Sequence, residues 1–140
     1  MLMTMRGRLG WGEAMRLNQV TVSAKNIPES IAFYRLLGLR LIVESPHYAR
    51  FECPDGESTF SLHLDPAFAG GGGTVVYFEH DVLDVLVQQL KARGLQFDSD
   101  PRDQSWLWRE AYLSDPSGNR ICLFQAGAAR RYPPWRVVGD

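Results

Sequence analysis

The sequence predicts an α+β fold of two βαβββ modules in tandem, each a curved mixed sheet with a helix on its convex face, enclosing a cavity. Sliding the 140-residue chain by 56 positions aligns its two halves, so that Val20 meets Val76 and Gly38 meets Gly94. Each copy has the pattern of a strand, an amphipathic helix, a glycine stop and further strands. We therefore expect modules at residues 16–66 and 74–126 within one structural domain, joined by a Gly-rich linker at 67–73.

Local signals define both helices. Asn26 is a candidate N-cap, with Glu29 three residues later as its capping-box partner. Apolar residues then recur at helical spacing until Gly38, which supplies a C-terminal stop. The second helix is expected to begin near Asp81 and to end at Gly94.

Short strand-like runs, bounded by turn signals, follow each helix. The turns are predicted at Asp55-Gly56 in the first module and at residues 116–119 in the second. The expected strands are Leu39–Glu44, Tyr48–Cys53, Thr59–Leu64, Leu95–Phe97, Trp106–Leu113 and Arg120–Gln125.

The charge balance excludes several classes of function. Lys and Arg number 15 against 16 Asp and Glu, giving a net charge of -1, and 45% of the residues are hydrophobic. A nucleic-acid or membrane-surface binder needs a basic excess, and a membrane span needs about 20 apolar residues in a row. Two cysteines are too few for a disulfide scaffold and suit a reducing compartment. We expect a cytoplasmic protein with no nucleic-acid or membrane partner.

The two ends of the chain lack the periodicity of the modules. Residues 1–15 contain no apolar core of a secretory signal and are interpreted as a disordered leader, with Met15 as an alternative start. Residues 127–140 form a basic, aromatic tail. We expect its Trp135 to pack on its own domain or on a partner subunit, because the rest of the chain supplies no basic field for RNA.

Alternation along the strands assigns polar and aromatic side chains to the sheet face without helices. Several large rings would then face water on an open sheet. A curved sheet around a cavity explains them better, with the polar groups orienting a ligand. The candidate ligand-binding residues are Gln19, Thr21, Arg50, Glu52, Ser61, Tyr77, Trp108, Tyr112, Arg120 and Cys122.

Three motifs, in this order and spacing, resemble the vicinal oxygen chelate superfamily, which includes glyoxalase I, bleomycin-resistance proteins and extradiol dioxygenases. The motifs are Leu17–Val22, Ser30–Tyr34 with Leu37–Leu39, and Asp115–Asn119 with Ile121–Phe124. The resemblance covers about residues 16–125 and implies a small-molecule ligand and a homodimer. It does not specify the reaction, because one fold hosts many chemistries.

In metal-dependent members of this superfamily, the resemblance places the ligands at Gln19, Ser61, Val75 and Cys122. Val75 has no donor atom, and Ser61 is rarely a ligand. Gln19 is a weak neutral ligand, although some glyoxalase I enzymes use Gln there, and Cys122 binds Zn only as a thiolate. We therefore expect no cofactor, with a divalent metal (Zn, Ni, Mn or Fe) as the alternative.

Three residues are candidates for catalysis. His63 is a possible general base on the helix-free face, and Glu79 or Glu110 would orient its imidazole. The simpler interpretation is that His63 bonds a neighbour and that the two acids form ion pairs with Arg50, Arg109 or Arg120. The segment Trp106–Glu110 also has two interpretations: a stacking wall for a planar ligand, or two Trp side chains packed on opposite faces.

Two functions follow from these assignments. The first is a metal-free protein that binds a small aromatic or zwitterionic molecule. The second is a divergent metal-dependent lyase, isomerase or dioxygenase whose site is built from Gln19, His63 and Glu79 or Glu110. The sequence leaves open whether the protein is an enzyme.

Overall fold

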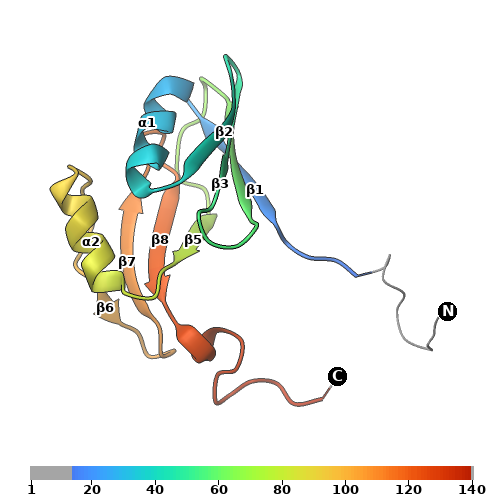
Figure 1. Ribbon diagram of the computed structural model, residues 1–140, viewed down its shortest axis with the longest axis vertical. Coiled ribbons are helices and arrows are strands. Elements are labelled where there is room, and N and C mark those ends of the chain that lie inside the picture. The colour runs from blue at the N-terminus through green and yellow to red at the C-terminus, as the bar shows by residue number, and fades with distance from the viewer. Residues whose placement is uncertain (1–13, 140) are drawn as a thin grey trace.

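The computed structural model describes residues 14–139 and contains two four-stranded sheets (Figure 1). The sheets have the orders β1-β4-β3-β2 and β5-β8-β7-β6, with β1–β4 and β5–β8 parallel and the other pairs antiparallel. The predicted α+β fold of two tandem modules is confirmed. The elements are β1 (Gln19–Ala24), α1 (Ile27–Leu37), β2 (Arg40–Ser45), β3 (Tyr48–Glu52), β4 (Thr59–Leu64), β5 (Val75–Glu79), α2 (Leu83–Ala92), β6 (Arg102–Asp103), β7 (Arg109–Ser114) and β8 (Arg120–Gln125).

The described residues before β1 and after β8 lie outside the two sheets. The leader expected at residues 1–15 falls almost entirely outside the described residues. A short 3-10 helix (Gly127–Arg130) follows β8, and the C-terminal segment then runs away from the sheets (Figure 1). Between residues 14 and 139, none of the helices has the length and apolar character needed to cross a membrane.

The two helices are capped in different ways. In α1 the Asn26 side chain accepts a hydrogen bond of 2.8 Å from the Glu29 amide, and Gly38 adopts φ +115° at the C-cap, as predicted. Helix α2 has no side-chain cap of its own. Instead, the side chain of Gln125, at the end of β8, accepts a hydrogen bond of 2.9 Å from the Leu83 amide. The start of α2 is therefore fixed by its own sheet.

Two strand predictions in the second module are wrong. The run 95–97 is not a strand, and the edge strand β6 lies further on, at Arg102–Asp103. The segment 106–108 is a turn rather than part of β7, because the Gln104 amide donates to the Trp108 carbonyl at 2.7 Å. Leu107 within this turn has φ +72°, a conformation that leucine rarely adopts. The chain reverses here, and β7 begins only at Arg109.

The helix-facing side chains of both sheets form one hydrophobic core. Ala111, Leu113, Ile121 and Leu123 from β7 and β8 are at most 1% exposed, as the predicted alternation requires. The ring of Phe60 on β4 lies 5.7 Å from the ring of Phe78 on β5, so the cores of the two modules are continuous.

The β7–β8 turn of the second module is hydrogen-bonded to the first module. Asp115 is buried, and its carboxylate accepts a hydrogen bond of 2.6 Å from the Tyr34 hydroxyl on α1. The Asn119 amide group donates to the same carboxylate and to the Ser23 carbonyl on β1, both at 2.8 Å. Burial, followed by the negative charge of Asp115, raises the pKa of the Tyr34 phenol.

We predict that Tyr34→Phe lowers the free energy of unfolding by about 1–3 kcal/mol, because it leaves the buried carboxylate one donor short. Urea denaturation measures the change. Tyr132→Phe, which alters an exposed tyrosine of the C-terminal tail, is the control and should have no effect. Equal stability of the two variants would contradict this role for Tyr34.

Candidate functional site

The first module carries a polar cluster on its helix-free face. The Tyr48 hydroxyl lies 2.6 Å from the Ser61 hydroxyl and accepts a hydrogen bond of 2.9 Å from Nε of Arg50. The hydrogen bond with Ser61, and then the bond and charge of Arg50, lower the pKa of the Tyr48 phenol. Ser61 is fully buried beneath this network. The cluster therefore presents a hydroxyl that a nearby cation polarises.

The other predicted residues of this face lie around that cluster. Gln19 accepts a hydrogen bond of 2.8 Å from the Thr59 hydroxyl, and Glu52 forms an exposed ion pair with Arg40 at 3.0 Å. Thr21 stands beside Ser61 in the β1–β4 register, and His63 stands beside Tyr48 in the β3–β4 register. Thr21 and His63 are both exposed.

The second module carries an aromatic cluster, formed by Tyr77, Trp108 and Phe124. The Trp108 and Phe124 rings are stacked with centroids 4.7 Å apart. Tyr77 stands edge-on to both, at 6.0 Å from Trp108 and 5.6 Å from Phe124. Phe124 is 4% exposed, whereas Tyr77 is 45% exposed. The cluster is therefore buried at Phe124 and accessible to solvent at Tyr77.

Glu110 lies next to Phe124 of this aromatic cluster and is 3% exposed. One of its carboxylate oxygens accepts a hydrogen bond from Nε1 of Trp106 at 3.0 Å, and the other accepts one from the Tyr112 hydroxyl at 2.9 Å. In the β7–β8 register Glu110 stands directly opposite Phe124. Trp106 and Trp108 thus both contact residues of the helix-free face and do not pack on opposite faces.

Cys122 is buried between Tyr77 and Tyr112 in the register of the second sheet. Burial, followed by the negative charge of Glu110, raises the pKa of its thiol to about 12. Burial of the Tyr112 phenol likewise raises its pKa. Arg120 lies over the Tyr112 ring at 4.6 Å and pairs with Asp98. Cys122 is therefore a protonated, neutral side chain near neutral pH.

The structure does not pair His63 with either acid. Glu79 forms an ion pair of 3.3 Å with Arg130 of the C-terminal segment, and Glu110 is bound as described above. The simpler expectation was also wrong about the partners, because Arg109 pairs with Asp84 at 2.9 Å and with Asp103 at 3.0 Å. Among the side-chain hydrogen bonds of residues 14–139, none joins the polar cluster to Glu79 or Glu110.

The four positions that the family resemblance implies as metal ligands, Gln19, Ser61, Val75 and Cys122, do not offer a metal-binding donor set. The Gln19 and Ser61 oxygens are engaged with Thr59 and Tyr48, and Cys122 is held as a thiol. Val75 contributes only apolar atoms. Within residues 14–139, no three His, Cys, Asp or Glu side chains are grouped so that they could hold a metal ion. These four side chains therefore do not fit a divalent metal, which binds best to imidazole, thiolate or carboxylate.

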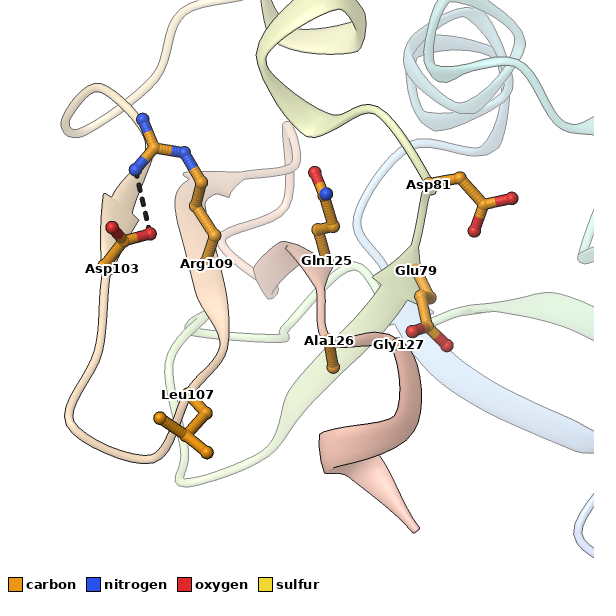
Figure 2. A pocket seen from close by; sticks show the side chains of 8 residues that line it. All are labelled: Glu79, Asp81, Asp103, Leu107, Arg109, Gln125, Ala126 and Gly127. Carbon is orange, nitrogen blue, oxygen red and sulfur yellow. Dashed lines mark hydrogen bonds and ion pairs between the residues drawn. The ribbon is translucent and has the colours of Figure 1, made fainter. Parts of the chain in front are cut away.

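A pocket of about 350 Å³ lies at the end of the second sheet, below the start of α2 (Figure 2). Arg109 extends along one wall toward Asp103, as the dashed contact in Figure 2 shows. Of its lining residues, Glu79 is a catalytic candidate from the sequence, and Leu107 and Arg109 belong to the Trp106–Glu110 segment considered as a stacking wall. The other five lie at strand ends or outside the strands, where strand alternation does not predict the direction of a side chain. The lining residues are Glu79, Asp81, Asp103, Leu107, Arg109, Gln125, Ala126 and Gly127.

The family model described as the Glyoxalase/Bleomycin resistance protein/Dioxygenase superfamily matches residues 16–123. The chain belongs to this superfamily. The family resemblance predicted from the three sequence motifs is thus confirmed. No curated protein matches the chain significantly.

Solved structures of this superfamily share the fold. A glyoxalase/bleomycin resistance protein/dioxygenase from Nocardioides is 26% identical, with 81% of this chain and 85% of that chain covered and a TM-score of 0.66. A bleomycin-binding protein complexed with bleomycin is 20% identical, with 80% and 98% covered and a TM-score of 0.67. A lactoylglutathione lyase from Agrobacterium tumefaciens is 15% identical, with 89% and 99% covered and a TM-score of 0.69.

We predict that Cys122 does not react with a thiol reagent such as Ellman's reagent in the folded protein at pH 8. Its pKa of about 12 leaves almost no thiolate at that pH, and the sulfur is buried. The measurement uses Cys53→Ser, in which Cys122 is the remaining cysteine, and compares folded protein with protein in denaturant. Rapid labelling of the folded variant would show that Cys122 is an accessible nucleophile.

Proposed function

We propose that this protein binds a small organic molecule with an aromatic ring, without a metal, on the helix-free face of its second sheet. The observation that supports this proposal is the aromatic cluster. Trp108 and Phe124 are held in a stacked arrangement, while Tyr77 remains 45% exposed at the open side. Rings that are fixed in place and open on one side gain contact area when a planar molecule stacks on them.

The family context agrees with a binding function. One structural relative holds bleomycin in its crystal structure, so this fold accommodates an organic ligand in at least that protein. In the present chain, the residues at the usual metal positions supply one apolar side chain and one neutral thiol. The ligand is therefore proposed to be held by stacking and polar contacts instead of by a metal.

We also propose that the protein acts as a homodimer in the cytoplasm. The two sheets do not join into a closed barrel, and the helix-free face of each has exposed side chains, such as Thr21 and Tyr77. A second copy placed against these faces would complete the walls of a cavity. Large apolar side chains of the C-terminal tail, including Trp135 at 57% exposure, offer further contact area.

We predict that Trp108→Ala weakens binding of planar aromatic compounds by about 5- to 30-fold, because a stacked ring contributes roughly 1–2 kcal/mol. A thermal-shift screen identifies compounds that stabilise the protein, and titration calorimetry measures their affinities. Val85→Ala, which truncates an exposed apolar side chain of α2 on the helix side of the sheet, is the control and should bind as the wild type does. A screen in which no aromatic compound stabilises the wild type would overturn the proposed function.

Native mass spectrometry of protein purified without chelators tests both metal content and subunit number. We predict a mass of two chains with no stoichiometric metal. A divergent metal-dependent lyase, isomerase or dioxygenase would instead carry stoichiometric Zn, Ni, Mn or Fe. That metal would be lost in His63→Ala and retained in the control His47→Ala, and this result would replace the binding function with the enzymatic one.

A further inference from the structure

Glu110 is a buried carboxylate without a cationic partner. None of the ion pairs formed by residues 14–139 includes it. Its two hydrogen-bond donors, the Trp106 indole and the Tyr112 hydroxyl, are both neutral. An ionised carboxylate inside a protein is costly unless its charge is balanced, so this arrangement favours the arrival of a positive group.

The neighbouring charges form no ion pair with Glu110. Arg102, on the edge strand β6, stands opposite Glu110 in the β6–β7 register, but its side chain is exposed and none of the ion pairs of residues 14–139 joins the two. Arg120 lies over the Tyr112 ring but forms its ion pair with Asp98. Glu79, on the same face, is matched by Arg130. The negative charge of Glu110 is also felt by its surroundings, since it helps to raise the pKa of the Cys122 thiol. Among residues 14–139, Glu110 is thus a buried acid of this face that forms no ion pair.

Glu110 lies close to the aromatic cluster, so its charge acts on a ligand bound there. Phe124 stands directly opposite it across β7 and β8, and Trp108 precedes it by two residues and stacks on Phe124. Opposed residues in an antiparallel pair have Cβ atoms about 5 Å apart. A ring seated on the cluster therefore lies close to the carboxylate. The faces of aromatic rings are themselves electron-rich and attract cations.

Building on the binding function proposed above, we infer that the ligand is a planar aromatic cation and that Glu110 is the residue that selects its charge. The aromatic cluster binds the ring, and the Glu110 carboxylate stabilises the positive charge at short range in a site of low polarity. An anion of the same shape would meet both the carboxylate and the ring faces and would be repelled. This assignment narrows the ligand from any aromatic or zwitterionic molecule to one chemical class.

The test compares three probes of the same two-ring size and different fixed charge. They are 1-methylquinolinium, 1-methylnaphthalene and 1-naphthoate, which are positive, neutral and negative at neutral pH. Titration calorimetry and quenching of tryptophan fluorescence measure their affinities for the wild-type protein. We expect 1-methylquinolinium to bind at least about tenfold more tightly than 1-methylnaphthalene, with 1-naphthoate the weakest of the three.

Glu110→Gln removes the charge and keeps the size and an acceptor oxygen. We expect this variant to lose the preference for 1-methylquinolinium, while the affinity for 1-methylnaphthalene stays within about twofold of the wild type. Glu57→Gln, at an exposed glutamate of the β3–β4 turn, is the matched control and should keep the full preference. Circular dichroism confirms that each variant is folded.

The outcomes separate this inference from the proposed function. If the wild type binds all three probes equally, or if folded Glu110→Gln keeps the preference for the cation, the charge selection is wrong and the aromatic binding function stands. If no probe binds the wild type, the binding function fails and the inference falls with it. The ranking on wild-type protein decides the question even if Glu110→Gln does not fold.

Discussion

The buried carboxylate of Asp115 is the interaction on which the arrangement of the two modules depends. It accepts hydrogen bonds from the Tyr34 hydroxyl, the amides of Ser117 and Asn119, and the Asn119 side chain, all within 2.6–2.9 Å. A buried anion requires all of these donors at once, because each one lost leaves charge unsatisfied in a medium of low polarity. Tyr34 comes from the first module and the others from the β7–β8 turn. The same contact therefore closes that turn and fixes α1 against the second sheet.

On this common framework the two modules carry different chemistry. Both place small and apolar side chains under their helices, and the continuous core between Phe60 and Phe78 allows little variation there. Their helix-free faces are not under this restriction. The first bears Arg50 and Tyr48 in a hydrogen-bonded network, whereas the second bears stacked rings around a buried acid. The internal repeat thus preserves the scaffold and leaves the two binding surfaces free to differ.

Strand alternation and turn chemistry predicted the parts of this fold that short-range physics determines. The bounds of β4 and β8 agree with the expectation because an apolar period of two is set off by turn signals. The turn at Leu107 has no sequence signal, since leucine normally avoids a positive φ. Contacts between residues far apart in the sequence could not be predicted either. The contacts of Glu79 with Arg130 and of Gln125 with the start of α2 join segments that only the folded chain brings together.

The second module has two buried carboxylates, Asp115 and Glu110, which differ in their hydrogen bonding and therefore in their roles. Asp115 has four donors, three of them from its own tight turn, and it lies under α1 with no open side. Glu110 has two donors, both from side chains, and one of these, Trp106, is 42% exposed. Two donors leave acceptor capacity on a carboxylate, which has about four lone-pair sites. The first acid is saturated and structural. The second keeps both charge and acceptor capacity beside an open aromatic surface, which is the condition for recognising a ligand.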